Sequence, residues 1–415
     1  MKRIWLQWIK PGSIKFSSKC GITVSDNWGD DLRKTSDMKI AFVHDWINGM
    51  RGGERTLQAF LAIYPDADIF TLFHEPGTSS PEIDARVKNV SFLQRLPGST
   101  KGYRALLPFY TMAVRKFDLS GYDLIISLSH AVAKNVIVPR GAKHICYCFT
   151  PMRYIWDQTA AYFGWKRHLY WPLIASLRRT DIQCSASVHH FVAISRFVAA
   201  RIRHFYGRDS QVIYPPVNVD FINHTDESSA KKGEAFLCAG ALVPYKRVDA
   251  VVDAFNELGE KLWISGTGPC DSDLRSRAKS NIEFLGFLTD AQLAERYRKC
   301  RALIFAGTED FGMIPIECMA AGRPVIAVHK GGLKETVRGI KPWAPGELAP
   351  EDATGVFVRG DQHRLGASIA QSMRFFQQHE ERFSAESCRR QAQLFSPQRF
   401  FSGWAELASK VGIAV

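Results

Sequence analysis

Short apolar segments alternate with mixed polar and apolar segments from Met38 onward. An unbroken apolar run between turn residues is typical of a buried strand in a parallel sheet, and a helical period is typical of the connections. In the first half, the pattern predicts strands at Lys39–His44, Asp68–Phe73, Tyr122–Ser127, Lys143–Cys148 and Val188–Ile194. It predicts helices at Glu54–Ile63, after a flexible loop at 49–53, and from the N-cap Ser195 to about His204.

The alternation stops at Pro215-Pro216 and restarts after a polar stretch at 224–234. Beyond it, the pattern predicts a helix at Val248–Leu258 and strands at Ala235–Ala239, Lys261–Ser265, Ile282–Phe284, Ala302–Ala306 and Pro324–Val328. This order predicts an α/β fold with two Rossmann-like, parallel-sheet domains, at 38–217 and 218–395. Because ligands of such folds bind beyond the carboxyl ends of the strands, we expect the site in a cleft between the domains.

The first 37 residues do not fit this pattern. Met1-Lys2-Arg3 resembles the start of a signal sequence, but the apolar run after it is broken by Gln7 and ends at Lys10. We therefore predict that residues 1–37 are a dispensable extension and that Met38 is the working start. A weak amphipathic membrane anchor is the alternative.

The net charge of +13 is concentrated in one part of the chain. Between Lys101 and Ser210 there are 16 Lys and Arg against five Asp, a balance of +11. Such a field favours an anionic partner, which could be a membrane surface, a phosphate-bearing acceptor or nucleic acid; a solvated basic face is the alternative. Nine cysteines without a paired framework indicate a reducing compartment, and no apolar run is long enough to span a bilayer.

The most informative segment runs from Glu309 to Gly322. It follows the predicted strand Ala302–Ala306 and begins a helix that Gly322 ends. Backbone N–H groups around 312–314 would form an anion site there, because the start of a helix attracts negative charge. Glu309 before the helix and Glu317 within it are placed to accept sugar hydroxyls. A strand, loop and helix with surface glutamates is the alternative.

The two glutamates lie in the context of Phe311-Gly312, Ala320-Ala321-Gly322 and Pro324-Val325-Ile326-Ala327. In this context the segment resembles the retaining glycosyltransferases of family four, whose signature is this glutamate pair, and the resemblance runs through almost the whole chain from Met38. It implies the GT-B fold, with a last helix at 396–415 that crosses back to the first domain. It also implies a catalytic role for Glu309 and donor contacts from Phe311, Gly312, Met313, Ile314 and Glu317.

A second match to the family is the loop from Gly240 to Asp249. In the family this loop places an arginine and a lysine on the donor diphosphate. Lys246 stands at the lysine position and is implied as a catalytic residue, because its ammonium would stabilise the leaving phosphate. The arginine position holds Ala241. Either Arg247 supplies the second charge, or the site relies on Lys246 and the helix amides.

Glycine-rich turns in both halves resemble family turns that approach the donor. Gly266 and Gly268 follow the strand Lys261–Ser265 and are implied as donor contacts, although a plain turn would have the same sequence. Gly53 lies in the turn after the first strand and is implied to lie over the donor phosphates. No G-x-G-x-x-G follows that strand, which argues against a dinucleotide dehydrogenase.

His130 lies just past the strand Tyr122–Ser127. The resemblance implies that it reaches the donor sugar as a catalytic residue; a hydrogen-bonded core histidine is the alternative. The dipeptide His44-Asp45, after the first strand, is a further candidate for the cleft. The segment Phe149–Asp157 resembles bacterial O-antigen and exopolysaccharide transferases, several of which use GDP-mannose. The aromatic and basic stretch Tyr162–Trp171 suits a membrane interface or, alternatively, a partly buried core.

Together these features predict transfer of a hexose, with retention, from a nucleotide-sugar donor to a lipid-linked oligosaccharide or polysaccharide acceptor. Mannose from GDP-mannose is the preferred donor, and a UDP-sugar is the alternative. The resemblance implies no metal and no other cofactor. We expect the protein in the cytoplasm, on the anionic inner face of the plasma membrane. A GT-B epimerase or phosphorylase shares the fold, whereas the absence of any recognised nucleic-acid-binding module argues against a nucleic-acid partner.

Overall fold

The computed structural model of the chain describes residues 38–97, 103–159, 164–222, 233–344, 350–361 and 363–413. The predicted extension 1–37 lies outside the described residues, as do most of the polar stretch 224–234 and residues 160–163. Contacts divide the chain into two compact units. The first comprises the chain up to Leu128, Val132–Ile145 and Trp404–Val415, and the second comprises Ser129–Ala131 and Cys146–Gly403.

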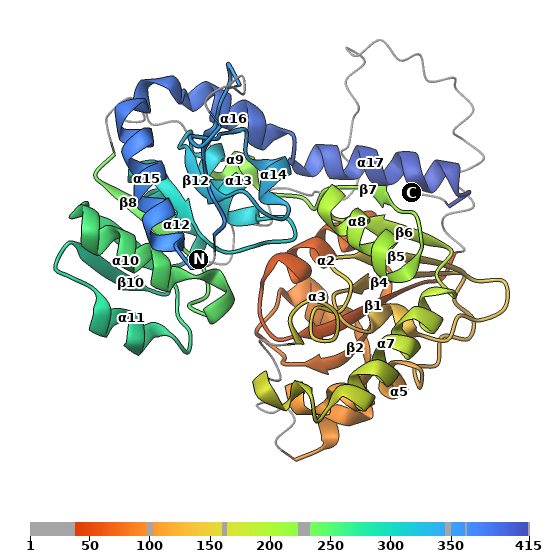
Figure 1. Ribbon diagram of the computed structural model, residues 1–415. Coiled ribbons are helices and arrows are strands. Elements are labelled where there is room, and N and C mark those ends of the chain that lie inside the picture. Colours follow the sequence, from red (N-terminus) through yellow and green to blue (C-terminus); the bar gives the residue numbers. More distant parts are fainter. Residues whose placement is uncertain are drawn as a thin grey trace, which may run out of the picture. The chain divides into compact units, whose positions relative to one another are not determined.

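The strands form two seven-stranded sheets (Figure 1). The first sheet has the order β3-β2-β1-β4-β5-β6-β7. Its strands are β1 Ile40–Ile47, β2 Asp68–His74, β3 Val87–Val90, β4 Leu124–Ser129, β5 Lys143–Cys148, β6 His190–Ala193 and β7 Gln211–Val212. Strand β1 pairs in parallel with both β2 and β4, and β2 pairs in parallel with β3. This parallel arrangement requires the crossover helices that the alternating pattern predicts.

The connections of the first sheet combine α-helices and 3-10 helices. The α-helices are α2 Gly52–Ile63, α3 Pro81–Arg86, α5 Tyr110–Val114, α7 Trp171–Ser185, α8 Arg196–Tyr206 and α9 Val219–Ile222. The 3-10 helices are η3 Phe92–Arg95, η4 Tyr103–Phe109, η5 Ala133–Asn135 and η6 Gly164–Arg167. Helix α8 begins as predicted, because the Ser195 side chain accepts a hydrogen bond from the backbone of Val198.

The second sheet has the order β10-β9-β8-β11-β12-β14-β13. Its strands are β8 Ala235–Ala239, β9 Leu262–Ser265, β10 Ile282–Gly286, β11 Cys300–Phe305, β12 Val325–Val328, β13 Gly339–Ile340 and β14 Gly355–Val358. Its recorded pairs are all parallel, as in the pair of β8 with β9. The α/β fold with two parallel sheets is therefore confirmed.

The helices of the second sheet follow its strands. They are η8 Pro244–Lys246, α10 Val248–Leu258, α11 Asp271–Arg277, α12 Asp290–Lys299, α13 Met313–Ala320, α14 Leu333–Thr336, α15 Leu365–Gln378, η9 Glu380–Arg382, α16 Ala385–Gln393 and α17 Pro397–Lys410. Helix α10 packs on α15, and α13 packs on α16 (Figure 1). The buried rings of Phe236, Phe255 and Phe376 join strand β8 to α10 and α15. This core fixes the loops that leave the carboxyl ends of β8 and β11.

The part of the last helix from Trp404 onward belongs to the first unit. The indole of Trp404 on α17 donates to Tyr64 Oη at 3.0 Å and packs edge-on against Phe60 of α2. Trp404 is fully buried, and burial raises the pKa of Tyr64 to about 12. The division into domains at 217 and 218 stays a prediction.

Candidate functional site

The turn from β11 into α13 is shaped by Gly312, the residue at the N-cap of the helix. Gly312 has a φ of 91°, in the left-handed region that favours glycine, and a Cβ there would lie 2.8 Å from Leu333 Cδ2. Since glycine has no side chain that could accept a hydrogen bond, the N–H groups of Met313 and Ile314 donate none to an N-cap side chain. Such a helix start is suited to bind an anion.

Lys246 and Glu309, which the sequence predicts as catalytic residues, form an ion pair. Lys246 ends η8 after β8, and Glu309 lies after β11, the strand beside β8 in the sheet. The Lys246 ammonium also lies 5.0 Å from the centre of the Phe305 ring. The exposed fractions of the two side chains, 15% and 18%, leave both groups accessible to a ligand while most of their surface is covered.

The loop that carries Lys246 is held by Gly266 and Gly268. A Cβ on Gly266 would lie 1.9 Å from the carbonyl oxygen of Gly240, and a Cβ on Gly268 would lie 2.3 Å from that of Leu242. Leu242 also donates its backbone N–H to Thr267 at 2.9 Å. The structure therefore explains these glycines by the close packing of two loops, and a direct donor contact stays a prediction.

The loop that carries Glu309 is held by a second glycine pair, Gly331 and Gly332, which the sequence analysis missed. Their Cβ atoms would lie 2.1 Å from the carbonyl oxygen of Glu309 and 2.4 Å from that of Asp310. The Gly332 N–H donates to Glu309 at 2.8 Å. The signal available was the Gly-Gly step after the predicted strand Pro324–Val328.

Asp310 is the centre of a buried ionic network that the sequence analysis also missed. Its Oδ2 accepts from Arg153 Nε at 2.9 Å, and its Oδ1 accepts from Arg201 Nη1 at 3.1 Å. Its backbone oxygen accepts from Ser195 Oγ at 2.6 Å. Arg201 also pairs with Asp157. Asp310 is only 5% exposed, so these bonds replace the hydration that its carboxylate loses on burial.

The charge of Arg153 is maintained by its neighbours. Burial lowers the pKa of its guanidinium, but the nearby carboxylates of Asp310 and Glu309 outweigh burial and raise the pKa above its ordinary value. Arg153 therefore stays charged and couples Asp310 electrostatically to Glu309. The sequence analysis noted the segment Phe149–Asp157 only for its resemblance, with no role for Arg153.

Three residues that were predicted to contact the donor, Arg247, Phe311 and Glu317, contact other residues of the protein. Arg247 has a φ of 54°, and its guanidinium pairs with Asp249 at 3.2 Å in the first turn of α10. The Phe311 side chain is buried between Tyr214 and Phe395, and its contact with the donor stays a prediction.

Glu317 lies in α13, and its Oε2 accepts from Tyr297 Oη at 2.9 Å. Tyr297 is buried, and burial raises the pKa of its hydroxyl well above the ordinary value, so that it remains a donor. This bond orients the Glu317 carboxylate, which is partly exposed.

The predicted residues of the first half are placed as follows. Gly53 belongs to the first turn of α2, which begins at Gly52, so the predicted loop at 49–53 is shorter than expected. His130 follows β4 as predicted, and its ring centre lies 6.3 Å from that of Phe149.

His44 and Asp45 are not cleft residues. Both are fully buried within β1. His44 Nδ1 lies 3.2 Å from the carbonyl oxygen of Leu128, and Asp45 accepts from the backbone N–H groups of Val132 and Ala133 at 2.7 and 2.8 Å. Strand β1 extends past the predicted end at His44 to Ile47, and the Asp45 carboxylate is hydrogen-bonded to the protein there.

Part of the aromatic and basic stretch Tyr162–Trp171 is described, and the side chains of Leu169, Tyr170 and Trp171 within it are exposed. Leu169 is 70% exposed and Trp171 is 54% exposed, which rules out the alternative of a buried core for these two. The Arg178 guanidinium lies 5.1 Å from the ring centres of both Trp156 and Trp171. The surface charge is smaller than the +11 of the sequence, because Lys134 and Arg201 are buried and Arg153 is bonded to Asp310.

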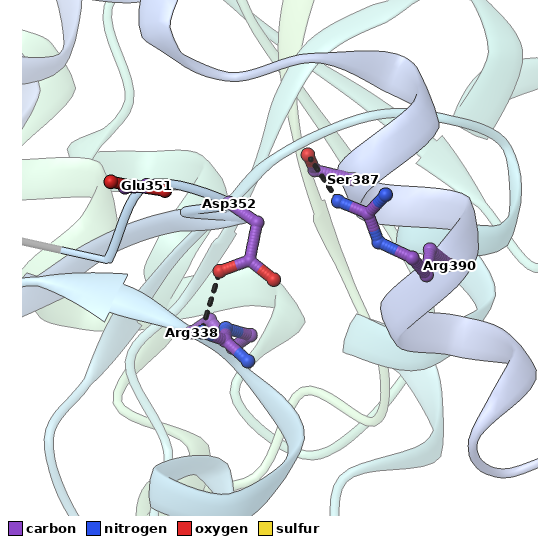
Figure 2. A pocket seen from close by; sticks show the side chains of 5 residues that line it. All are labelled: Arg338, Glu351, Asp352, Ser387 and Arg390. Carbon is purple, nitrogen blue, oxygen red and sulfur yellow. Dashed lines mark hydrogen bonds and ion pairs between the residues drawn. The ribbon is translucent and has the colours of Figure 1, made fainter.

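An open hollow with a volume of about 510 Å³ lies elsewhere in the second unit (Figure 2). Its lining residues are Arg338, Glu351, Asp352, Ser387 and Arg390. Arg338 pairs with Asp352 at 2.5 Å, and Arg390 donates to Ser387 at 3.3 Å (Figure 2). None of the predicted site residues lines it. Two arginines and two carboxylates balance each other, so the hollow favours neither an anion nor a cation.

In the described part of the chain, no group of three or more His, Cys, Asp or Glu side chains could hold a metal ion. Cys146 and Cys148 are buried in β5. None of the helices that the structure describes is long and apolar enough to cross a membrane.

Two family models match successive parts of the chain. Residues 51–221 match the model described as Glycosyltransferase Family 4. Residues 233–366 match the model described as Glycosyl transferases group 1. The two matches support a glycosyltransferase of the GT-B type that is similar to family 4. The matched ranges include Gly53 and His130 in the first model and Lys246, Glu309 and the rest of the predicted donor contacts in the second.

Two curated relatives of this family are similar to part of the chain. An uncharacterized glycosyltransferase of Methanocaldococcus jannaschii is 30% identical over 151 residues, which cover 35% of this chain and 42% of the relative. The GDP-mannose-dependent monoacylated alpha-(1-6)-phosphatidylinositol monomannoside mannosyltransferase of Corynebacterium glutamicum is 27% identical over 197 residues, which cover 40% of this chain and 51% of the relative. The chain thus spans about half the length of the relatives it matches.

The fold is also similar to that of a solved structure. The crystal structure of Anabaena HepE in complex with UDP has a TM-score of 0.63 and covers 90% of this chain and 100% of HepE. The two sequences are 16% identical, so this similarity shows the shared GT-B fold alone.

Proposed function

We propose that this protein transfers a sugar, with retention of configuration, from a nucleotide-sugar donor to an acceptor hydroxyl. The observation that carries the proposal is the Lys246–Glu309 ion pair beside the glycine-capped start of α13. A cation and free helix N–H groups stabilise a leaving diphosphate, and carboxylates bind sugar hydroxyls. The match of both halves to glycosyltransferase families supports the same conclusion.

The proposed reaction breaks the bond between the anomeric carbon and the donor phosphate oxygen. The acceptor oxygen forms the new bond from the same face, and its proton leaves with the departing diphosphate. Lys246 and the first amides of α13 stabilise the charge on the diphosphate. Glu309 and Glu317 hold the sugar hydroxyls, and His130 reaches the sugar near the reacting carbon. The mechanism needs no metal.

GDP-mannose is the proposed donor. The segment Phe149–Asp157, which resembles bacterial mannosyltransferases, and the GDP-mannose dependence in the name of the Corynebacterium relative support this proposal. A UDP-sugar is the second candidate, since HepE was crystallised with UDP. Thermal unfolding with UDP, GDP and ADP at equal concentrations separates them, because a ligand at 100 times its Kd stabilises the folded state by about 2.7 kcal/mol. We expect the largest rise in Tm with GDP.

The acceptor is proposed to be a lipid-linked oligosaccharide at the anionic inner face of the plasma membrane. The exposed side chains of Leu169 and Trp171, with the exposed Arg167 and Arg179 nearby in the chain, support docking on anionic lipid. Charge reversal in Arg167→Glu/Arg179→Glu should reduce flotation with phosphatidylglycerol vesicles at low salt, and the matched control is Arg203→Glu, at a residue that is also exposed. Equal flotation of the variant and the control would leave a merely solvated basic face.

Turnover of the donor tests the reaction itself. The full-length protein should release nucleoside diphosphate from GDP-mannose when a lipid-linked acceptor extract is present, and the anomeric configuration of the product, measured by NMR, should match that of the donor. Conversion of the donor to another sugar in the absence of acceptor would instead support an epimerase.

A further inference from the structure

If the proposed function holds, the donor site has to balance the negative charge of a nucleoside diphosphate. A leaving nucleoside diphosphate carries at least two negative charges, and Lys246 is one cation that is already paired with Glu309. Position 241, where the family has an arginine, holds an exposed alanine. Arg247, the sequence-based candidate for the second charge, pairs with Asp249 in the first turn of α10. A second cation from another part of the fold would add to the charge that Lys246 and the first amides of α13 supply.

Arg153 lies beside the site. Its Nε and Nη2 donate to Oδ2 of Asp310, the residue that follows Glu309 and precedes the N-cap Gly312 by two positions. The Arg153 side chain is 23% exposed, whereas the Asp310 and Arg201 side chains are 8% and 9% exposed. The guanidinium is therefore bonded to a residue that adjoins Glu309 in the sequence and lies two positions before the N-cap of α13.

The Asp310 network does not depend on Arg153 alone. Arg201 bonds to Asp310 at 3.1 Å and also to Thr150 and Asp157, so both of its Nη groups are bonded to the protein. Both bonds of Arg153 end on the same oxygen, and among the described residues its Nη1 makes no hydrogen bond. If Arg153 were removed, Arg201 would still neutralise Asp310. Arg201 is thus a structural residue, whereas Arg153 has one N–H group, Nη1, that can bind a ligand.

We propose that Arg153 binds the donor diphosphate and supplies the charge that Ala241 lacks. Asp310 holds the guanidinium by its Nε edge and leaves Nη1 for a phosphate oxygen. A planar guanidinium binds phosphate more specifically than an ammonium, so a lysine cannot fully replace it. Lys246 and Arg153 then contact the diphosphate from two segments that are far apart in the sequence, one after β8 and one after β5.

Titration calorimetry on the full-length protein tests this with GDP and UDP as probes, and with guanosine and uridine as matched probes without phosphate. The variants are Arg153→Gln and Arg153→Lys, and the control is Arg203→Gln, an exposed arginine paired with Asp209. A charge-assisted bond contributes about 1.5–3 kcal/mol, so Arg153→Gln should weaken the bound diphosphate about 10-fold to 100-fold. Arg153→Lys should lose less, and nucleoside affinity should not change.

Each result decides the matter. If Arg153→Gln binds the diphosphate as wild type does, or loses diphosphate and nucleoside equally, Arg153 is a structural residue and the inference is wrong, while the proposed function stands. If the wild-type protein binds neither GDP nor UDP, the proposed function fails and the inference fails with it. If the free energy of unfolding of Arg153→Gln equals that of the wild type, Arg201 maintains the network without Arg153.

Discussion

The two loops that build the donor site should be coupled through Gly268. A Cβ at this position would lie 2.3 Å from the Leu242 carbonyl oxygen, far inside an ordinary contact, so Gly268→Ala must push the two loops apart. That movement strains the Leu242–Thr267 and Cys270–Leu242 backbone hydrogen bonds, of 2.9 and 3.1 Å. Two such bonds at about 1 kcal/mol each, with about 1 kcal/mol for overpacking, give a loss of about 3 kcal/mol.

The control is Gly286→Ala. Gly286 is the last residue of strand β10 in the same sheet, but it has a φ of 65° and no atom within 4 Å of its Cβ position. This substitution introduces backbone strain of about 1 kcal/mol without a collision. Gly268 itself has no positive φ, so its substitution reports the collision alone.

Thermal unfolding and diphosphate titration of both variants provide the assay. A loss of about 3 kcal/mol lowers the Tm by about 6–12 °C for a domain of this size. Because Lys246 lies on the displaced loop, Gly268→Ala should also weaken diphosphate binding, whereas Gly286→Ala should not. If Gly268→Ala costs less stability than Gly286→Ala, the loops are not packed as described and the account of Lys246 positioning is refuted.

Three further predictions follow from the same contacts. Lys246→Ala should weaken diphosphate binding by about 2 kcal/mol in calorimetry, as loss of a charge-assisted contact does, and unchanged affinity would exclude Lys246 from the site. Deletion of residues 1–37 should leave transfer activity unchanged, and a soluble but inactive product would show that the extension is needed. Burial raises the pKa of Glu54 in the folded protein above its ordinary value. The wild type therefore loses stability as the pH rises from the ordinary pKa of a glutamate through the raised one, and Glu54→Gln does not. The free energy of unfolding of Glu54→Gln, measured at several pH values, should rise relative to that of the wild type as the pH rises. A difference that is constant with pH would contradict this.

The strand and helix order could be predicted because hydrophobic runs are continuous in parallel strands. The predicted bounds of β5, β8 and α10 agree with the structure residue for residue. The edge strands β3 and β13 were missed, because an edge strand is short and half exposed and leaves no apolar run.

The candidate site was only partly predictable. Local motifs identified Glu309 and Lys246, and the structure pairs them. The Asp310–Arg153 bond joins residues 157 positions apart, and no local spacing indicates such a pair. Arg247 was a candidate because of its position next to Lys246, but the turn at φ 54° directs it to Asp249. A count of charges in the sequence could not separate surface arginines from those that, like Arg201, neutralise buried carboxylates.

The most direct test of the central claim is the rate at which Glu309→Ala transfers sugar from the donor that stabilises the wild type. The control is Glu283→Ala, at an exposed glutamate on β10. The account predicts that Glu309→Ala remains folded and binds nucleoside diphosphate, yet loses transfer by 100-fold or more, about 2.7 kcal/mol in the barrier, while Glu283→Ala keeps wild-type activity. Transfer by Glu309→Ala within about threefold of wild type, less than ~1 kcal/mol of barrier, would contradict the claim that this loop is the catalytic centre.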